Sequence, residues 1–374
     1  MVMDRAYRIC KRCIMDTSDP EIVFDDKGNC NHCTDALAQS KTSWFPNSQG
    51  EEKLMAIVDK IKKTQKRKEY DCIIGLSGGV DSSYLAYKVV QLGLKPLVVH
   101  VDCGWNSELA VQNVQNIVQK LNLDLHTHVV NWEEMKDLQL AFFKANVANQ
   151  DVPQDHAIFA ALYSYAVKNN IKYVFNGYNF ATECILPKAW GYKAMDYKSL
   201  KSIHKKFGKK KLRKFPYVTY FRRFIYFRYI RKMKIVMPLN LMPYDKEQAM
   251  KEMEQKLNWQ YYGGKHHESR FTKFFQAYYL PHKFGYDKRR AHLSSLIVSG
   301  QLSRNEALEE MKIEIYPNNS HITDMEYVAK KLGVSNEEFE RIIAMPNRTY
   351  TDYPNNEWLF NLGLDIKNKF FSKN

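Results

Sequence analysis

The chain has 374 residues, of which 45% are hydrophobic, and its formal net charge is +15. A chain of this length is too long for a single hydrophobic core, so two or three domains are expected. The sequence contains no signal peptide and no charge-free apolar run of about 18 residues, which argues against a secreted or membrane-spanning protein and predicts a cytoplasmic location. The 7 cysteines fit that compartment as metal ligands or reduced thiols.

Two Cys-x-x-Cys pairs lie near the start of the chain, Cys10 with Cys13 and Cys30 with Cys33. Four thiolates at this spacing suit tetrahedral Zn²⁺ in a closed, structural site. An iron–sulfur cluster is the alternative, whereas two disulfides are disfavoured in a reducing compartment. Residues 21–29, between the pairs, are expected to form a hairpin with a glycine turn.

A glycine-rich turn follows an apolar run at 71–76 that is typical of a strand buried on both faces. Adjacent glycines let the backbone approach a ligand, and free N–H groups at the start of the next helix form an anion site. The carboxylate of Asp81 offers a place for Mg²⁺ on a phosphate. The turn is neither a Walker loop nor a Gly-x-Gly-x-x-Gly dinucleotide motif. It predicts a phosphate cradle made of Gly75, Ser77, Gly78, Gly79, Asp81, Ser82 and Ser83.

Strands and helical patterns alternate from this point on. Further apolar runs occur at 96–101, 125–130, 172–176 and 234–237. The alternation predicts an α/β fold, a Rossmann-like doubly wound parallel sheet with ligands at the carboxyl ends of its strands. Asp102 follows the second strand, where a nucleoside would lie, although a turn or cap is the simpler interpretation. Gly177 and Glu183 follow the fourth strand, where a surface cap is the alternative for Glu183.

A basic block runs from Lys193 to Lys234 and holds 16 Lys and Arg against one acidic residue, Asp196. The rest of the chain is therefore close to neutral, which weakens any whole-chain argument for nucleic-acid binding. Tyr and Phe alternate with the basic residues. Three interpretations remain open: an RNA-binding surface, a surface that contacts an anionic membrane, or an interface with a protein partner. A helical stripe at Tyr220, Phe224, Phe227 and Ile230 is expected to be packed.

The last third of the chain is expected to be helical. Helix starts are predicted at Asp245, Ser303, Thr323 and Ser335, each followed three residues later by Glu or Gln. Between them, residues 261–276 and 280–295 are polar, aromatic and weakly periodic. Their glycines suggest a loop close to a ligand, and their candidates for phosphate contact are Lys283, Lys288, Arg289 and Arg290.

Two motifs resemble the ATP-pyrophosphatase superfamily, whose members split ATP into AMP and pyrophosphate. Ser-Gly-Gly-Val-Asp-Ser-Ser at 77–83 resembles its PP-loop, and 176–183 resembles the matching segment of PP-loop synthetases, including NAD synthetase. This resemblance implies that Glu183 joins Asp81 in coordinating Mg²⁺ on the pyrophosphate, beside Gly177.

Further segments resemble the N-acetyl sugar amidotransferases of bacterial surface-polysaccharide, lipopolysaccharide O-antigen and nonulosonic-acid biosynthesis. They are the Cys₄ module, Tyr-Tyr-Gly-Gly-Lys-His-His-Glu at 261–268 and Leu-Pro-His-Lys-Phe-Gly-Tyr-Asp-Lys-Arg-Arg-Ala-His-Leu at 280–293. The resemblance runs from about residue 10 to residue 310 but does not extend to the basic block. It implies ATP, Mg²⁺ and Zn²⁺ as cofactors, and an N-acetylated sugar or nucleotide-sugar as substrate.

The implied reaction converts an acetamido group into an acetamidino group. AMP is transferred to the amide oxygen, ammonia attacks, and a lysine, Lys265 or Lys283, neutralises charge at the α-phosphate. Residue 2 is Val and no Gly-x-Cys-x-Gly elbow occurs, so no glutaminase site is expected. The family implies a separate glutaminase resembling that of imidazole glycerol phosphate synthase, with its cyclase-like companion as a further candidate partner. The basic block is one candidate docking surface for it.

Two other functions compete with this one. A PP-loop tRNA thiolase would need a sulfur-carrying cysteine, for which Cys103 and Cys184 are candidates, but tRNA is not the expected partner. A catalytically dead scaffold is disfavoured by the intact Ser77, Asp81 and Glu183. The expected domains are a Cys₄ module at 1–45, a PP-loop domain at 65–245 with the basic block at 193–234 inserted, and a helical region at 246–374 that contributes to the active site.

Overall fold

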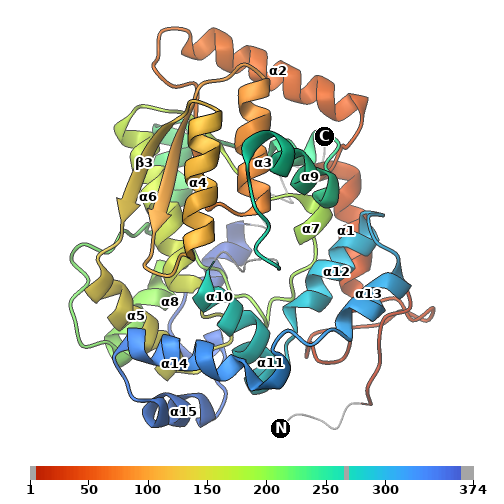
Figure 1. The fold of residues 1–374 in the computed structure, drawn as a ribbon, viewed down its shortest axis with the longest axis vertical. Coiled ribbons are helices and arrows are strands. Elements are labelled where there is room, and N and C mark those ends of the chain that lie inside the picture. Colours follow the sequence, from red (N-terminus) through yellow and green to blue (C-terminus); the bar gives the residue numbers. More distant parts are fainter. Residues whose placement is uncertain (1–5, 265–268, 364–374) are drawn as a thin grey trace.

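A computed structural model describes residues 6–264 and 269–363 (Figure 1). Five parallel strands form one sheet in the order β3-β2-β1-β4-β5. The strands are β1 (Cys72–Gly75), β2 (Pro96–Asp102), β3 (Asp124–Val129), β4 (Tyr173–Phe175) and β5 (Lys234–Val236). Each lies where the sequence predicts an apolar strand, so the expected doubly wound parallel sheet is confirmed.

The centre of the sheet is β1, whose Ile73 and Ile74 are fully buried. Ile74 pairs with Val98 of β2 on one side and with Phe175 of β4 on the other. Because the chain order reverses between β1 and β4, the connections that leave these two strands diverge. A crevice then forms outside their carboxyl ends, which is where open α/β sheets bind ligands.

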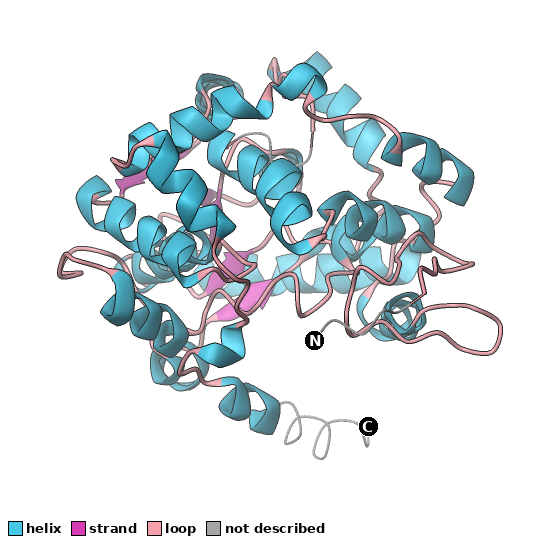
Figure 2. Cartoon of the chain, turned by 90° about the horizontal axis from the view of Figure 1, so that it is seen from below, coloured by secondary structure: helices cyan, strands magenta, loops and turns pink. Residues whose placement is uncertain are grey.

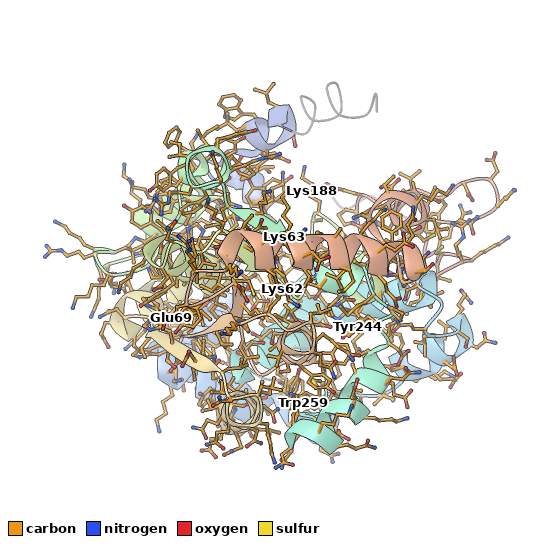
Figure 3. All side chains as sticks on the ribbon, turned by 90° about the horizontal axis from the view of Figure 1, so that it is seen from above. Lys62, Lys63, Glu69, Lys188, Tyr244 and Trp259 are labelled. Atoms are coloured by element: carbon orange, nitrogen blue, oxygen red, sulfur yellow. The ribbon has the colours of Figure 1, made fainter. Side chains whose placement is uncertain are left out.

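One face of the sheet is covered by four helices that share a core with β1 and β2. They are α2 (Ser48–Gln65), α3 (Val80–Gln91), α4 (Glu108–Lys120) and α9 (Lys246–Leu257). Figure 3 shows α2 crossing this side of the molecule with Lys62 and Lys63 along it. The position of α9 shows that the chain beyond residue 245 packs directly onto the sheet.

The opposite face carries the larger core. It is built by α5 (Trp132–Ala145), α6 (Val152–Lys168), α8 (Tyr197–Phe207), η1 (Arg222–Ile230), α14 (His321–Leu332) and α15 (Asn336–Ala344). A continuous helical rod adds to it, made of α10 (Arg270–Phe274), η3 (Phe275–Tyr279) and α11 (Leu280–Phe284). Figure 2 shows the strands enclosed among helices. None of the helices in the described part of the chain has the length and apolar character that crossing a bilayer requires.

The N-terminal cysteine module packs at one end of the sheet. It leads into α1 (Asn31–Ser43) and shares a core with α7 (Phe180–Glu183) and α12 (Lys288–Val298), beside which lies α13 (Arg304–Met311). The hairpin predicted at 21–29 is only a tight turn closed by a single bridge between Phe24 and Cys30. The Asp25 side chain accepts a hydrogen bond from the Asn29 amide, so the turn closes on itself before strands can form.

Three of the four predicted helix starts are confirmed: Asp245, Ser303 and Ser335 are the N-caps of α9, α13 and α15. The fourth was wrong, since α14 begins at His321 and Thr323 lies in its first turn. A short 3₁₀ turn, η4 (Pro317–Asn319), runs into α14 and sets its start instead. Two more 3₁₀ turns are η2 (Pro238–Asn240) and η5 (Tyr350–Asp352).

The basic block divides into two parts. The loop after α8 is held by acids of α5: Asp137 accepts the backbone N–H groups of Lys209 and Lys210, and Glu134 accepts that of Phe215. The second part is η1, which packs on α6 through Phe227. The predicted packed stripe is correct for Phe227 but wrong for Ile230, which is exposed because the helix turns its outer side to solvent.

Candidate active site

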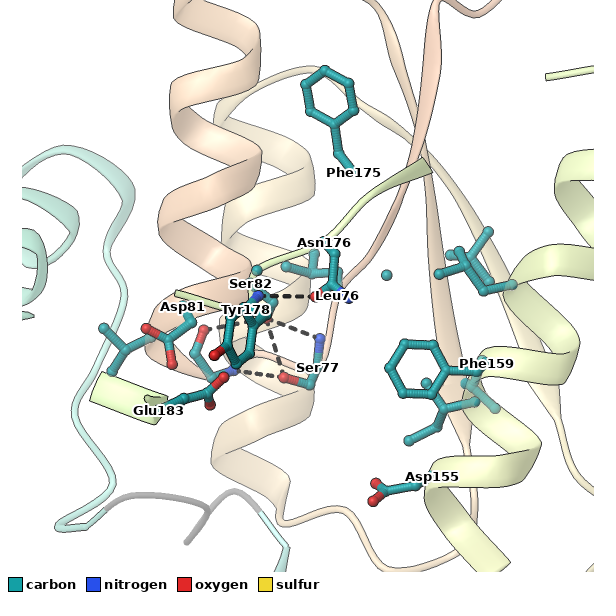
Figure 4. A pocket seen from close by; sticks show the side chains of 18 of the residues that line it. Leu76, Ser77, Asp81, Ser82, Asp155, Phe159, Phe175, Asn176, Tyr178 and Glu183 are labelled. Carbon is teal, nitrogen blue, oxygen red and sulfur yellow. Dashed lines mark hydrogen bonds between the residues drawn. The ribbon is translucent and has the colours of Figure 1, made fainter. Parts of the chain in front are cut away.

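A cavity of about 660 Å³ opens at the carboxyl ends of β1, β2 and β4, in the crevice where the strand order reverses (Figure 4). One part of its wall is polar and comes from the turn after β1 and from α7. The other part is apolar and comes from α6 and the strand ends, including Phe159, Leu162 and Val101. Figure 4 shows Asp81 and Glu183 on one side of Ser77, and Phe159 and Asp155 on the other.

The turn between β1 and α3 is fixed by its own hydroxyl groups. Ser82 Oγ accepts the Ser77 N–H at 3.2 Å and lies 3.1 Å from Ser77 Oγ, while Ser77 Oγ accepts the Gly79 N–H. Gly78 has φ +85°, and a Cβ there would lie 2.4 Å from the carbonyl oxygen of Ala110 on α4. The first glycine is therefore required by close packing against α4.

The start of α3 has the features of an anion site. Its N-cap, Gly79, places no side chain over the first turn. Gly177, which follows β4, lies directly against this helix start. A Cβ on Gly177 would lie 3.3 to 3.4 Å from the peptide group that joins Asp81 and Ser82. A side chain at 177 would crowd this peptide. The Tyr262 hydroxyl accepts the Val80 N–H at 3.1 Å, so a phosphate oxygen that binds this helix start would take the place of that hydroxyl.

Asp81 lies in the first turn of α3 and is held by two neutral donors. Asn179 Nδ2 donates to its Oδ1 at 2.9 Å, and the Tyr244 hydroxyl donates a very short hydrogen bond to the same oxygen. Burial first, and then the charge of Asp81 and its hydrogen bond, raise the pKa of Tyr244 well above its usual range. Tyr244 therefore remains a hydrogen-bond donor, and it leaves the second oxygen of Asp81 available to a ligand.

Glu183 ends the short helix α7 and lines the same cavity. Asn179 is the N-cap of α7, so one residue both starts the helix that carries Glu183 and orients Asp81. The charge of Glu183 also contributes to the raised pKa of Tyr244, which places the two acids around one hydroxyl group. The structure thus brings together Asp81 and Glu183 from strand ends 100 residues apart in the chain, as the strand-end rule predicts.

Two other expected members of this site lie elsewhere. Ser83 is fully buried on the inner side of α3, so its hydroxyl cannot reach a phosphate. Asp102 does not line the cavity; its Oδ1 accepts the Gly104 N–H at 2.7 Å, which makes it the turn residue of the simpler interpretation. Both predictions were wrong for one reason: helix rotation and loop direction decide which side chains face the crevice.

Of the two candidate lysines, Lys283 does not join the site either. Lys283 Nζ donates to the carbonyl oxygens of Ile343 and Met345, at 2.6 and 2.5 Å, and so binds the end of α15 away from the cavity. Lys265 lies outside the described residues. Sequence reasoning missed Lys246, the first residue of α9, which lines the cavity. The sequence pattern that could have indicated Lys246 was weak, because it consisted only of the predicted helix cap at Asp245.

A second cavity of about 460 Å³ adjoins the first and shares a wall with it. Lys246, Tyr261, Tyr262 and Gly264 line both. The rest of its polar lining mixes bases with acids, among them Lys288 and Arg289 of the 280–293 motif and the opposite charges Glu310 and Glu314. Lys288 lies 3.8 Å from Asp151, and Arg289 pairs with Asp287 at 2.7 Å. The last candidate for phosphate contact, Arg290, instead forms an ion pair with Asp16 at 3.0 Å, next to the cysteine module.

The four N-terminal cysteines converge as predicted. Their Sγ atoms all lie within 4.8 Å of one another; those of Cys13 and Cys30 are 3.5 Å apart, and those of Cys10 and Cys33 are 3.8 Å apart. Tetrahedral zinc with Zn–S bonds of about 2.3 Å requires sulfur atoms roughly 3.8 Å apart, so the cluster fits the ion. Backbone N–H groups donate to Cys10 Sγ, which suits a thiolate. The cluster could hold zinc in a closed, structural site.

The cysteines that a thiolase would use are poorly placed for that role. Cys103 is buried in the larger core, where burial raises the pKa of its thiol, and it does not line the cavity. Cys184 follows Glu183 but packs against the core of the cysteine module. A persulfide carrier needs a reactive, accessible thiolate. The thiolase alternative is therefore not favoured.

The fold and the cavity define a PP-loop, ATP-utilising class of protein. Residues 53–218 match the NAD synthase family model, and residues 268–367 match the model described as LPS biosynthesis protein WbpG-like, C-terminal domain. Together the two matches support a PP-loop amidotransferase family of polysaccharide biosynthesis, which is the resemblance seen in the sequence. The NAD synthase match supports an ATP-dependent enzyme that forms or transfers amide nitrogen.

Three solved structures are among those to which the chain is similar. They are an NH3-dependent NAD synthetase from Campylobacter jejuni (21% identity, TM-score 0.26, 35% of this chain and 57% of that chain), an NMN synthetase from Francisella tularensis (16%, 0.35, 72% and 98%) and an NAD+ synthetase from Burkholderia pseudomallei (15%, 0.28, 60% and 95%). This chain thus spans little more than half of the Campylobacter enzyme. No curated protein matches the chain.

Proposed function

We propose that this chain is an ATP-dependent amidotransferase that converts the acetamido group of an N-acetylated sugar into an acetamidino group and releases AMP and pyrophosphate. The observation that carries the proposal is the pair of adjoining cavities. One has the phosphate cradle and two acids of an ATP site, and the other opens across a shared wall at Lys246 and Tyr262. Adenylation requires two substrates to meet at one such wall.

The first cavity suits ATP. Its apolar part, between α6 and the strand ends, offers a surface for adenosine. The start of α3 and the close approach of Gly177 suit the phosphates. Oxygen ligands are those that Mg²⁺ prefers, and Asp81 and Glu183 would hold that ion, whose charge stabilises departing pyrophosphate.

The chemistry requires an activated amide. The amide oxygen of the sugar attacks the α-phosphorus of ATP, and pyrophosphate leaves. Ammonia then adds to the carbon, and AMP departs with the original oxygen while nitrogen loses a proton. Lys246, at the shared wall, takes the role that the sequence assigned to Lys265 or Lys283, because a cation there can offset charge at the α-phosphate.

The acceptor belongs in the second cavity. Lys288 and Arg289 line this cavity, each held by an acid, Asp151 and Asp287, and they would turn to an acceptor with a negatively charged group. This group could be the diphosphate of a nucleotide-sugar or the carboxylate of an acidic sugar. Residues of the WbpG-like match, 268–367, supply much of this wall, which supports a polysaccharide precursor as the acceptor.

Ammonia would come from a separate glutaminase. Four of the seven cysteines form the Cys₄ cluster, Cys72 and Cys103 are buried with raised thiol pKa values, and Cys184 packs against the core of the cysteine module. None of the seven is in an arrangement typical of a glutaminase nucleophile. With glutamine as the only nitrogen donor, AMP release should require an added glutaminase resembling that of imidazole glycerol phosphate synthase. Full glutamine-dependent activity of the isolated chain would contradict this.

The direct test is incubation with ATP, Mg²⁺, ammonium and a panel of diacetamido sugars, free and nucleotide-linked. We expect AMP rather than ADP, and a product in which an NH group has replaced one oxygen, detected by mass spectrometry. AMP release without modification of any sugar, or ADP as product, would contradict the proposal.

Lys246→Met should lower kcat by roughly 100-fold with little change in the binding of ATP, because the lysine acts on charge that grows in the transition state. Lys251→Met is the matched control, since Lys251 lies on the same helix in an exposed ion pair with Glu247. Equal losses in the two variants would show that Lys246 has no special role.

A further inference from the structure

The outer side of η1 exposes an unusual row of apolar side chains. Phe221, Ile225 and Tyr229 are spaced four residues apart, and Ile230 follows; their exposed fractions are 41% to 62%. The inner side of the same helix is well packed, with Phe227 buried against Tyr163 of α6. The helix is therefore anchored, and its outer apolar row is a stable feature of the surface.

Basic side chains flank this row. Arg222, Arg228 and Lys232 are exposed, and no acid in the described residues forms an ion pair with them. Arg231, at the end of η1, lies near Lys68. The pKa of Lys68 is lowered, by burial first and then by the positive charges of Lys172 and Arg231. Positive charge thus accumulates on this side of the molecule.

A second helical segment extends the apolar surface. Residues 357–363 pack beside η1: the Tyr220 hydroxyl donates to the carbonyl oxygen of Leu359 at 3.1 Å, and the Phe360 ring contacts Tyr220 and Phe224. Two residues of this segment that do not make those contacts, Trp358 and Leu362, are 62% and 49% exposed. Two neighbouring helices therefore both present apolar side chains to solvent.

We propose that this outer face, defined as Phe221, Arg222, Ile225, Arg228, Tyr229, Ile230, Lys232, Trp358 and Leu362, binds the surface of an anionic lipid bilayer. Helices that lie in a membrane interface place large apolar residues among the headgroups and basic residues beside anionic lipids. Aromatic residues are also favoured at that depth. The charge of the basic block, 16 Lys and Arg against one acid, complements such a surface.

A bilayer fits these residues better than RNA or a protein. Single-stranded RNA is bound by planar side chains in a basic groove, whereas Ile225, Ile230 and Leu362 are aliphatic and cannot stack on bases. Protein interfaces favour the aromatic residues and Arg that this face also carries, but they are depleted in Lys, which Lys232 adds here beside the exposed aliphatic side chains. None of the outer-face residues lines either cavity, so this inference is independent of the proposed reaction.

The test is co-sedimentation of the full chain with vesicles. Vesicles of phosphatidylglycerol and phosphatidylethanolamine should retain the protein, and vesicles of phosphatidylcholine should not. Retention should fall as ionic strength rises from about 0.1 M to about 1 M, which shortens the Debye length from roughly 10 Å to 3 Å. Retention that ignores both lipid charge and salt would overturn the electrostatic part of the inference.

Two variants separate charge from apolar contact. R222E/R228E/K232E should weaken binding to the anionic vesicles by about 100-fold or more, because each basic residue near the surface contributes roughly fivefold. The matched control, K60E/K62E/K63E, makes the same change of charge on α2, on the other helical layer, and should retain most binding. Similar losses in both would show that only net charge matters, which would overturn a defined face.

F221S/I225S/Y229S should weaken binding by about tenfold or more while keeping every charge, since less apolar area enters the interface. V23S/M55S/V129S is its control, because these residues are also exposed but lie far from η1 in the sequence and on other elements. Both outer-face variants should match the parent chain in circular dichroism and thermal unfolding, which shows that they are folded. Full vesicle binding by both variants, or binding of single-stranded RNA in place of vesicles, would overturn the proposal.

Discussion

The cysteine cluster and the pair Asp81–Glu183 are both made of metal-ligand side chains, yet they are built in different ways. The four Sγ atoms already lie within 4.8 Å of one another in a buried module. Asp81 and Glu183 come from separate elements and are partly exposed to a cavity, and Asp81 is oriented by the neutral donors Asn179 and Tyr244. The first arrangement suits a permanent ion, and the second suits an ion that arrives with its phosphate and leaves with it.

The two regions are nevertheless connected. Arg304 donates to the carbonyl oxygens of Cys10 and Cys13, and the Ile14 N–H donates to Ser294 of α12. The Ile185 N–H, just after Glu183, donates to Ser295 of the same helix. Helix α12 thus contacts both the cysteine module and the segment that carries Glu183. The difference teaches that the cysteine module supports the scaffold that carries Glu183.

The largest effect should follow Asp81→Asn. The variant keeps an oxygen to accept the hydrogen bonds of Asn179 and Tyr244, so the fold should be unchanged. It loses the charge that would hold Mg²⁺, and AMP formation should fall on the order of 1,000-fold. The measurement is AMP release with saturating ATP, alongside thermal unfolding.

Glu183→Gln is the companion variant for Asp81→Asn, since it removes the other proposed ligand from the same cavity. We expect a loss of similar size, and raised Mg²⁺ concentration should partly rescue either variant. Near-normal turnover by Glu183→Gln would remove Glu183 from the metal site and leave it as a cap of α7.

Cys13→Ser should have the next largest effect, and it should act through stability. Three thiolates hold zinc more weakly, and because binding of a structural ion is coupled to folding, the free energy of unfolding should fall by about 4 kcal/mol. Zinc content, measured on the purified protein, should fall from one ion per chain. Activity should fall in parallel with the folded fraction, since α12 loses its support.

Cys184→Ser is the control for Cys13→Ser, because Cys184 lies next to Glu183 but outside the cluster. It should retain zinc, stability and AMP formation. Complete loss of activity in this control, with the fold preserved, would instead favour the thiolase. Absence of both zinc and iron from the parent protein would contradict the metal assignment as a whole.

The sequence was sufficient to predict the five strands and the meeting of Asp81 with Glu183, because parallel strands bring their carboxyl ends to one edge. The sequence was not sufficient to predict that Tyr244 and Lys246 take part in the site. Tyr244 reaches Asp81, and Lys246 reaches the cavity, only because α9 returns to pack on α3, a contact between helices about 160 residues apart. A short apolar run determines its own strand, whereas such a long-range contact depends on the whole core.

Tyr244→Phe should give a smaller effect that sharpens the comparison further. Loss of the hydroxyl leaves Asp81 with one orienting donor, so kcat should fall by about tenfold and stability by about 1 kcal/mol. The pKa of Tyr244 is raised well above its usual range, so this hydroxyl stays protonated across the neutral range. The variant should therefore keep the shape of the parent pH–rate profile.

Tyr84→Phe is the matched control for Tyr244→Phe. Tyr84 is a neighbouring ring on α3, 5.5 Å from Tyr244, whose hydroxyl donates to Glu252 instead of an active-site acid. It should lose some stability without a change in kcat. If both variants lost activity equally, the role of Tyr244 would be packing and not orientation of Asp81.

The smallest effect should come from Lys283→Met, which tests the lysine that the structure removes from the active site. Lys283 Nζ donates to the carbonyl oxygens of Ile343 and Met345, where the last turn of α15 leaves such groups unpaired and where a cation complements the helix dipole. Burial lowers the pKa of Lys283, which shows that its environment already disfavours the charge. These opposing contributions should leave a net loss of about 1 kcal/mol in the free energy of unfolding, with AMP formation unchanged.

Lys312→Met, in an exposed ion pair with Glu309, is the control and should change stability by less than about 0.5 kcal/mol. Loss of AMP formation in Lys283→Met without unfolding would mean that α11 moves during turnover and brings this lysine to the α-phosphate.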